Sequence, residues 1–329
     1  MNDEQLRQLF ERLTYLRNLE EKKEQVLSSI EEQGKLTEEL KTQILAAETL
    51  VVVDDLYRPY RPKRRTRATI AKEKGLEPLA ALITMQKTTT PIEEAAKGYI
   101  SEEKEVKNVQ DAIAGAKDII AEYISDEADY RIYIRDLTVK QGKLTSVAKN
   151  PEEQSVYEMY YEFEEPVSKL AGHRVLALNR GEKEKILTVK IEAPEEKILQ
   201  YLEKKVIHAE NPYTMPLLKE AIEDSYKRLI APAIEREIRN DLTEKAEDGA
   251  INVFGKNLEQ LLMQPPIVGQ TVLGWDPAFR TGCKLAVVDP TGKVLDTTVI
   301  YPTAPTTPQK IAAAKDTLKK LIKKYHITL

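Results

Sequence analysis

The first fifty residues carry apolar and polar positions with the spacing of α-helices. Between Glu4 and Ile30 the apolar side chains recur every three or four residues, which predicts a long amphipathic helix that ends near Gly34. Thr37 is a favourable N-cap and is followed by acidic residues in "TEEL". A second helix is therefore predicted from Thr37 to about Leu50.

Helical spacing returns after a short stretch that contains prolines. Residues 67–86 predict two short helical pieces broken near Gly75, and residues 108–142 predict further helices with a restart at Ser125. We interpret residues 108–142 as a helix-turn-helix-like core. Small side chains in it allow the close approach of a neighbouring helix, and they are Ala112, Ala114, Gly115 and Ala116.

Alternating patterns indicate strands in two places. From Leu176 to Glu192, "LALNRGEKEKILTVKIE" predicts a small β-hairpin or edge strands. A long helical region follows, kinked or interrupted at Pro232, and ends at Pro265 and Pro266. Three further strands are then predicted before one amphipathic helix, at Thr271 to Trp275, Cys283 to Val288 and Lys293 to Ile300.

These elements predict a mainly α fold with two parts. Residues 1–266 form a multi-helical region with the helix-turn-helix-like part and the small β-hairpin, and residues 267–329 form an incomplete α/β domain. Three strands and one helix do not enclose an α/β core, because such a sheet needs more covering helices. The last residues, "HITL", resemble the start of another strand, so we expect the sequence to end within this domain.

Composition excludes several classes of protein. The chain has 329 residues, of which 41% are hydrophobic and 32% charged, as in soluble globular proteins. It contains no run of about twenty apolar residues and no signal-peptide layout, so we expect a cytoplasmic location and no membrane contact. A single cysteine excludes an internal disulfide, and with three histidines the chain has few soft metal ligands. We expect no metal site and no cofactor.

Positive charge is concentrated in one place on a chain whose net charge is −4. The stretch from Arg58 to Arg67 contains no carboxylate, and Pro59 and Pro62 predict that it is extended. A polyanion can be held by an acidic protein only where cations gather. The cationic side chains of this segment are Arg58, Arg61, Lys63, Arg64, Arg65 and Arg67.

Two interpretations of this cationic segment stay open. Its cations can neutralise phosphates and release their counterions, while Tyr57 and Tyr60 can stack on an unpaired base. Six phosphate contacts on a duplex would give a slope of log affinity against log salt of about −5. In the other interpretation the arginines are solvated or bind acidic helix faces, for example at Glu20, Glu21 and Glu24.

Five long stretches, in this order, together resemble one known family: "LFERLTYLRNLEEKK", "DLYRPYRPKRRTRATIAKEKGLEPLA", "HRVLALNRGEKEKILTVKI", "YKRLIAPAIEREIRNDLTEKAEDGAI" and "GWDPAFRTGCKLAVVD". This is the Tex family of bacterial transcription accessory proteins, and the resemblance covers essentially the whole chain. It implies a helical N-terminal region, then a YqgF-type RNase H-like domain, then helix-hairpin-helix modules and an OB-fold RNA-binding domain. The last two have no counterpart in this sequence, so we expect a part of a longer protein.

The resemblance also implies a function. It implies a non-catalytic, nucleic-acid-binding transcription accessory factor that acts as a scaffold and contacts RNA or DNA mainly through the domains missing from this chain. RNA polymerase or ribosome-associated proteins are further implied partners, and we expect a monomer. Two alternatives are a metal-dependent RNase H-like nuclease or resolvase, and a protein-interaction scaffold without direct nucleic-acid contact.

The candidate catalytic chemistry is sparse. Asp276 ends the first predicted strand of the C-terminal domain, where RNase H-like nucleases place a metal-binding carboxylate, but two-metal chemistry needs several convergent acids. The family pattern Gly-x-Asp-Pro-Gly also ends here in Ala278. We expect Asp289 in "DPTG" to be a turn residue and Cys283 to be a packing residue in a strand. We therefore expect no catalytic residue and no enzyme activity.

Overall fold

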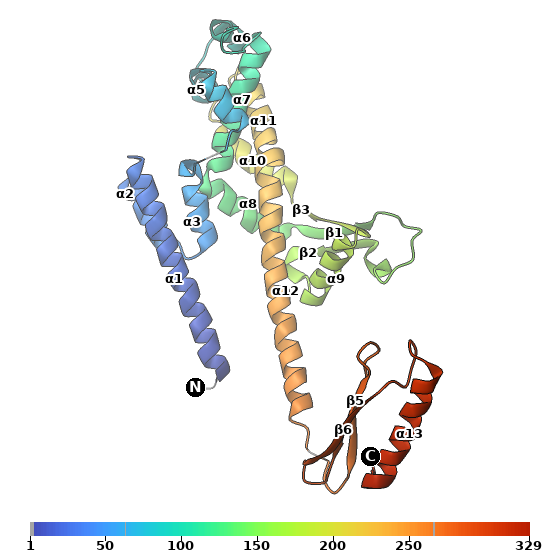
Figure 1. The fold of residues 1–329 in the computed structure, drawn as a ribbon. Helices are drawn as coiled ribbons and strands as arrows, with labels where there is room; N and C mark the ends of the chain where they lie inside the picture. Colours follow the sequence, from blue (N-terminus) through green and yellow to red (C-terminus); the bar gives the residue numbers. More distant parts are fainter. Residues whose placement is uncertain (1–2, 63, 266) are drawn as a thin grey trace. The chain divides into compact units, whose positions relative to one another are not determined.

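The computed structural model describes residues 3–62, 64–265 and 267–329, and the chain divides into two compact units, 1–252 and 253–329 (Figure 1). The fold is mainly helical with two small antiparallel sheets, as the sequence predicted. Pro266, half of the predicted domain boundary, lies outside the described residues. Among the described helices, none is both long enough and apolar enough to span a membrane.

The N-terminal helices form a small core of their own. These helices are α1 (Asp3–Glu32), α2 (Glu38–Ala46) and α3 (Leu50–Tyr57). The second predicted helix is wrong in its extent, because the Thr49 side chain caps a new helix by accepting a hydrogen bond from the Val52 amide. The buried side chains of this N-terminal core are Leu19, Val26, Ile30, Leu40, Ile44, Ala47 and Val53.

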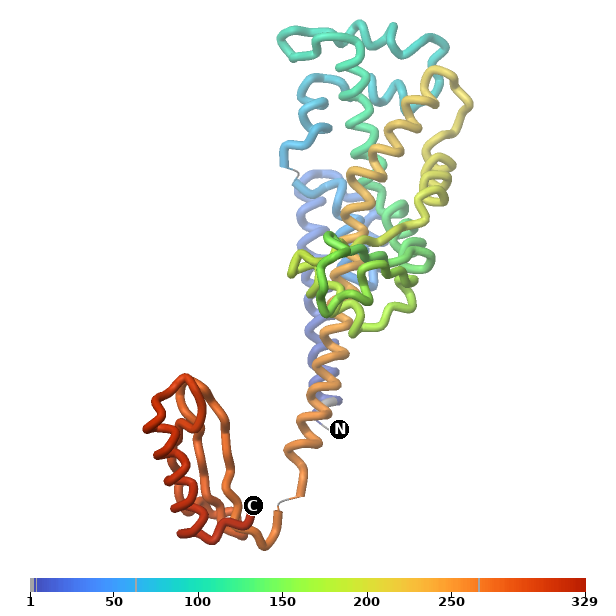
Figure 2. Tube along the Cα trace, turned by 90° about the vertical axis from the view of Figure 1, so that its right-hand side faces the viewer, coloured from blue at the N-terminus to red at the C-terminus, as the bar shows by residue number. Residues whose placement is uncertain are grey.

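A larger core surrounds α7, whose buried positions include Ala112, Ala116 and Ile119. Figures 1 and 2 show α7 beside α11. The predicted break near Gly75 is confirmed, since Gly75 has φ +80° between α4 and α5. The helices of this region are α4 (Arg67–Glu73), α5 (Glu77–Met85), α6 (Ile92–Ala96), α7 (Val109–Asp126), α8 (Ala128–Gln141), α10 (Glu195–Val206), α11 (Met215–Asp224) and α12 (Ala231–Leu262).

The small sheet of the first unit corrects the predicted hairpin. Its antiparallel strand order is β2-β1-β3, with β1 (Lys143–Ala148), β2 (Glu162–Pro166) and β3 (Leu187–Glu192). The first half of the predicted hairpin is instead helix α9 (Gly172–Lys183). Val175 and Leu178, three residues apart, are both buried on α9, a spacing that fits a helix better than a strand.

The interruption near Pro232 is a π-helical segment, Ser225–Ile230, that joins α11 to α12. Proline has no amide hydrogen and its ring crowds the carbonyl four residues earlier, so regular α-helical bonding to Arg228 is lost. A widened π turn is a common way to absorb such a defect. The predicted interruption is therefore confirmed, and it lies just before the proline.

The C-terminal unit contains the three predicted strands and the predicted helix. The antiparallel order is β4-β5-β6, with β4 (Val272–Asp276), β5 (Cys283–Val288) and β6 (Val294–Ile300), and α13 (Pro308–Tyr325) packs on one face. Cys283 is buried in this packing. Asp289 accepts hydrogen bonds from the Thr291 and Lys293 amides, which confirms its predicted turn.

The packing of α7 against Leu76, the residue that precedes α5, depends on the absence of a side chain at Gly115. A Cβ atom built there would lie 2.4 Å from Leu76 Cδ1, while Leu76 itself is almost fully buried. We expect Gly115→Val to lower the free energy of unfolding by about 1–3 kcal/mol through overpacking. The measurement is urea denaturation followed by circular dichroism.

Ala114 supplies the matched control for Gly115. It lies next to Gly115 on α7 but is exposed, so Ala114→Val adds the same β-branched side chain without the clash. Its cost should stay within about 1 kcal/mol, the size of a helix-propensity change. Equal destabilisation by both substitutions would contradict the close-packing explanation.

Candidate nucleic-acid interface

The cationic segment, Arg58 to Arg67, connects α3 to α4. We predicted an extended segment, and this is wrong for its first part, because Arg58–Tyr60 forms a 3-10 turn with proline in its first positions. Proline's fixed φ suits the start of a helical turn. Arg61, which precedes Pro62, is extended with ψ 132°, and the Thr66 side chain caps α4. Lys63 lies outside the described residues.

Arg58 points toward the protein rather than toward solvent. Its Nε lies 3.3 Å from Asp126 Oδ1, without the alignment of a hydrogen bond to any described residue. Burial lowers the pKa of Arg58 and the nearby charge of Arg131 lowers it further, while the carboxylates around it oppose the change. Arg58 is thus already engaged within the fold.

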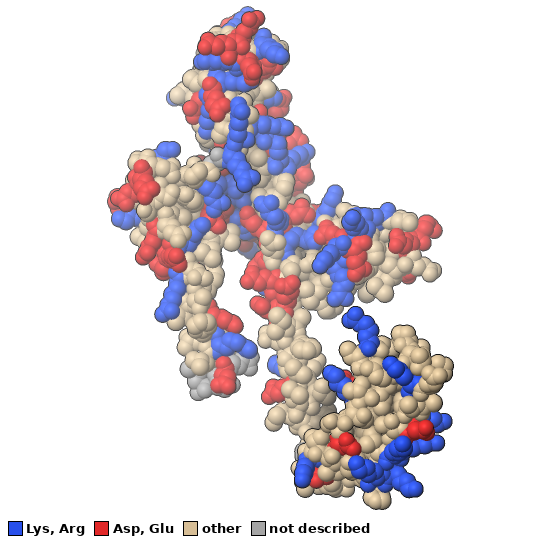
Figure 3. All heavy atoms as spheres, viewed as in Figure 1, with Lys and Arg blue, Asp and Glu red and all other residues tan. Residues whose placement is uncertain are grey.

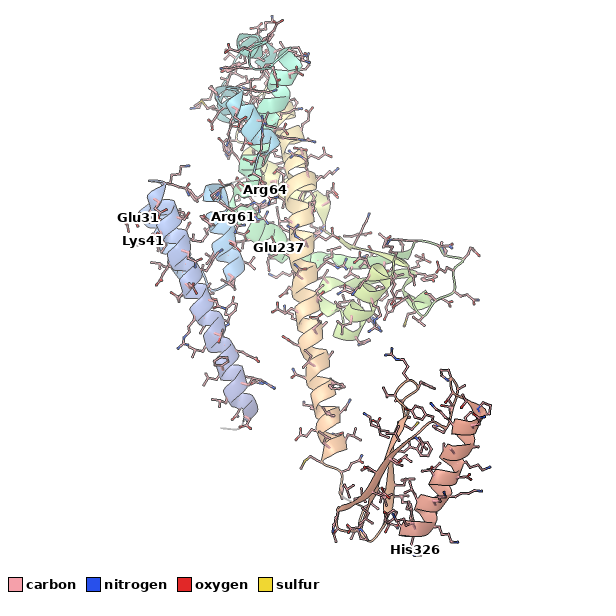
Figure 4. The ribbon with its side chains drawn as sticks, in the orientation of Figure 1. Glu31, Lys41, Arg61, Arg64, Glu237 and His326 are labelled. Carbon is pink, nitrogen blue, oxygen red and sulfur yellow. The ribbon has the colours of Figure 1, made fainter. Side chains whose placement is uncertain are left out.

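Arg61 is also engaged, although it is more exposed. Its Nη2 donates a hydrogen bond of 2.8 Å to Asp54 Oδ1, and its guanidinium lies 5.7 Å from the centre of the Tyr57 ring. Figure 4 labels Arg61 and Arg64 where the chain passes from α3 towards α4, and Lys and Arg side chains gather around the same place in Figure 3. Only part of this charge is open to a ligand.

The other described arginines of the segment are exposed. The Arg65 side chain is 73% exposed, and its one ion pair within the described ranges is a long one, 3.6 Å from Nη2 to Glu73 Oε2. For Arg64, no carboxylate of the described residues lies within ion-pair distance. Arg67 is exposed near Asp118, where burial raises the pKa of the carboxyl and the charges of Arg228 and Arg67 oppose that rise.

Tyr57 and Tyr60 pack against the N-terminal core. The Tyr57 hydroxyl is 2.9 Å from Ser29 Oγ, and the Tyr60 carbonyl accepts a hydrogen bond from Gln33 Nε2. Stacking on a base, as predicted for these two rings, would require them to leave that core. The arrangement therefore favours contacts to phosphate over contacts to bases at this segment.

The acidic partners of the segment differ from those considered in the sequence. Among the described residues, the arginines of the segment form ion pairs with Asp54, Asp126 and Glu73. None of these ion pairs is to the α1 residues Glu20, Glu21 or Glu24. The acidic partners come from α3, α7 and α4, elements that flank or contact the segment itself. Some arginines of the segment are thus bound to carboxylates of the fold and others are open, and phosphate binding by the open ones stays a prediction.

A cleft of about 750 Å³ lies beside the segment, with Arg61 and Tyr60 in its wall. Lys72 lines it as well, but so do the carboxylates of Glu122 and Glu127. The mixture of signs makes this cleft a poor site for a polyanion. The exposed arginines, rather than the cleft, are therefore the candidate contact surface.

A ring of four charged side chains follows the start of the segment in the fold, and the sequence did not reveal it. Asp55 and Arg131 are buried, while Arg135 and Glu237 are partly buried. Arg131, 1% exposed, donates from Nε to Asp55 Oδ1 (2.7 Å) and from Nη2 to Glu237 Oε1 (2.9 Å). Arg135 Nη2 donates to Asp55 Oδ2 and to Glu237 Oε2, both at 2.8 Å. Burial would lower the pKa of Arg135, but Asp55 and Glu237 outweigh it and raise the pKa. The charged ring thus joins α3, α8 and α12.

A weak signal for the charged ring was present in "LVVVDDLY". An aspartate on a short helix rich in valine is either exposed or buried with a partner, since an unpaired buried charge is very costly. The Asp54 side chain is exposed and binds Lys22 and Arg61, whereas Asp55 is buried and has an arginine partner. The sequence does not identify the arginines, because they lie on another helix.

In the C-terminal unit, Asp276 is exposed at the end of β4 and is in register with Lys284 of β5. Within the described ranges, no three His, Cys, Asp or Glu side chains are grouped as a metal site would require. Leu273 donates its amide hydrogen to the carbonyl of Leu329, so the last residues lie along β4.

The fold thus defines a mainly helical protein with a three-stranded α/β unit at its C-terminal end and an arginine-rich connection between helices. Comparison with known families assigns both parts. Residues 86–254 match the Tex central region-like family, and residues 270–329 match the Tex protein YqgF-like domain. The chain belongs to the Tex family.

Individual relatives support this assignment. The chain is 53% identical to the uncharacterized protein YdcI of Bacillus subtilis over 100% of its length and 46% of YdcI. It is 40% identical to the transcriptional accessory protein Tex of Neisseria gonorrhoeae, over 92% of the chain and 40% of that protein. It is 31% identical to the human S1 RNA-binding domain-containing protein 1, over 92% of the chain and 32% of that protein. The chain spans less than half the length of these relatives.

The charged ring makes Asp55 far more important for stability than its neighbour. Asp55→Ala leaves the buried Arg131 and the partly buried Arg135 with Glu237 as the remaining carboxylate of the ring, and we expect a loss of about 3–5 kcal/mol in the free energy of unfolding. Asp54→Ala removes an exposed carboxylate from the same helix and should cost about 1 kcal/mol or less. Urea denaturation of both variants measures the difference, and similar midpoints would contradict a structural role for the ring.

Proposed function

We propose that this chain is part of a nucleic-acid-binding transcription accessory factor that acts as a non-catalytic scaffold. A transcription-related role is supported by the relative named transcriptional accessory protein Tex. A link to nucleic acid is supported by the relative named for its S1 RNA-binding domain. The observation in this chain that carries the proposal is the group of exposed arginines Arg64, Arg65 and Arg67.

These three side chains suit the phosphate backbone. They lie within four consecutive residues at the start of α4, and a duplex carries one negative charge per about 1.7 Å of its axis, so phosphates are dense enough to meet them all. Backbone contacts of this kind position a protein without reading the base sequence. We therefore propose binding that depends on salt and is independent of sequence.

The scaffold role extends to the C-terminal unit. Asp276 is a single exposed carboxylate opposite Lys284, an arrangement that supports an interaction platform more than a nuclease that uses two metal ions. We propose that the protein needs no cofactor and acts in the cytoplasm as a monomer. Its protein partners would be RNA polymerase or ribosome-associated proteins.

Charge reversal at Arg64 and Arg65 tests the proposed contact. With three phosphate contacts, the slope of log affinity against log salt should be about −3 for a duplex, and Arg64→Glu with Arg65→Glu should reduce its magnitude by about 2. Affinity at low salt should fall at least about ten-fold, because two attractions become repulsions. Fluorescence anisotropy with a labelled duplex at several salt concentrations measures both quantities.

Lys41 and Lys149 provide the matched control, since both are exposed and lie on α2 and just after β1. Lys41→Glu with Lys149→Glu changes the net charge by the same amount elsewhere on the same unit, so it should leave the slope nearly unchanged. If both double variants weaken binding equally, general charge rather than this segment holds the ligand. If neither changes it, the chain does not bind nucleic acid through Arg64 and Arg65.

A further inference from the structure

A cluster of tyrosines lies between α8 and α10, separate from the cationic segment. The rings of Tyr133 and Tyr201 are stacked, with centroids 3.8 Å apart and planes inclined by 17°. Tyr130 meets Tyr201 edge to face, with centroids 6.1 Å apart at 89°. The side chains come from two helices of the same unit, so the stack is held by the fold and not by a mobile loop.

Tyr133 is the more exposed ring of the stacked pair, with 41% of its surface open to solvent. Buried tyrosines usually give their hydroxyl a hydrogen-bond partner. Within the described ranges, no protein group makes a hydrogen bond with the hydroxyl of Tyr133 or Tyr201. Tyr133 therefore presents part of its side chain to solvent while it stacks on Tyr201.

Positive charge accompanies the rings. Lys205 Nζ lies 5.8 Å from the centre of the Tyr201 ring, and Lys204 precedes it in the last turn of α10. Both lysines are exposed, and among the described residues neither has a carboxylate within ion-pair distance. Acidic groups lie nearby as well. Burial raises the pKa of Tyr201 and the charge of Asp129 raises it further, while burial and the charges of Glu127 and Asp129 raise the pKa of Tyr130. Lys204 and Lys205 thus place two positive charges at the end of α10, beside a cluster that also has acidic neighbours.

We propose that Tyr133 and Tyr201, with Lys204 and Lys205, form a stacking platform for an unpaired base of single-stranded RNA or DNA. In this proposal an incoming base stacks on the exposed Tyr133 ring, while the two ammonium groups bind the neighbouring phosphates. Stacking tolerates any base, because every base presents an aromatic face. The inference rests on the proposed function for its class of ligand, but it uses a different surface and a different chemistry from the arginines.

Removal of the Tyr133 ring tests the platform. One stacked base contributes about 1–3 kcal/mol, so Tyr133→Ala should weaken binding of fluorescein-labelled 15-mers of deoxythymidine and of uridine by about five-fold or more in anisotropy titrations. A labelled abasic 15-mer keeps the phosphates and lacks the bases. The wild type and Tyr133→Ala should therefore bind this oligomer equally.

Two further variants separate stacking from other effects of the substitution. Tyr133→Phe keeps the ring and should bind within about two-fold of the wild type. Tyr213 is also exposed and lies outside the tyrosine cluster, so Tyr213→Ala removes a comparable ring and should leave single-strand binding unchanged. Circular dichroism of each variant confirms that the fold persists.

The outcome is distinguishable from that of the arginine experiment. Unchanged binding of both base-containing oligomers by folded Tyr133→Ala would overturn the platform, even if charge reversal at Arg64 and Arg65 abolishes duplex binding. An equal loss for the abasic oligomer would also overturn it, since the effect would then not involve bases. Loss confined to the base-containing oligomers supports the platform even if the duplex result fails.

Discussion

The ionic ring of Asp55, Arg131, Arg135 and Glu237 is the interaction on which the first unit depends, because it joins helices that belong to different cores. Asp55 extends from α3 of the N-terminal core, while the other members stand on α8 and α12 of the larger core. Buried charges repay their desolvation only when hydrogen bonds are well directed. Such a ring therefore tolerates few arrangements of the three helices, whereas apolar side chains alone would tolerate more.

The position of α3 in turn decides which arginines of the cationic segment remain open. The two aspartates near the end of α3 have different partners, because neighbouring side chains of a helix point about 100° apart, so that Asp55 closes the charged ring while Asp54 binds Arg61. Arg58 follows within one turn and is drawn toward Asp126. The chain leaves this region only at Pro62, and the arginines beyond it are exposed. Of the described arginines in this segment, only those after Pro62 therefore remain open to a ligand, whereas those before it are paired with carboxylates of the fold.

Local patterns predicted much of this structure, and pairings between distant residues account for the rest. Apolar spacing and turn residues were sufficient for α1, for the break at Gly75 and for the C-terminal strands, whose partners adjoin in sequence. The alternating pattern that begins at Leu176 misled, because over so few residues it also occurs in the short helix α9. The charged ring and the tyrosine stack were beyond prediction, since Asp55 meets Glu237 through Arg131, and Tyr133 meets Tyr201, only in the folded chain.

The two proposed surfaces respond to solution conditions in different ways because their physics differ. Exposed guanidinium groups attract phosphates through a field that salt screens within about 10 Å at 0.1 M, so their contribution fades as ionic strength rises. Stacking on Tyr133 buries aromatic surface and depends little on salt. An acidic chain with both kinds of contact would meet nucleic acid first through charge and would retain a single strand through its bases. Discrimination between paired and unpaired nucleic acid then comes from the tyrosines, since a duplex hides the faces of its bases within the stack.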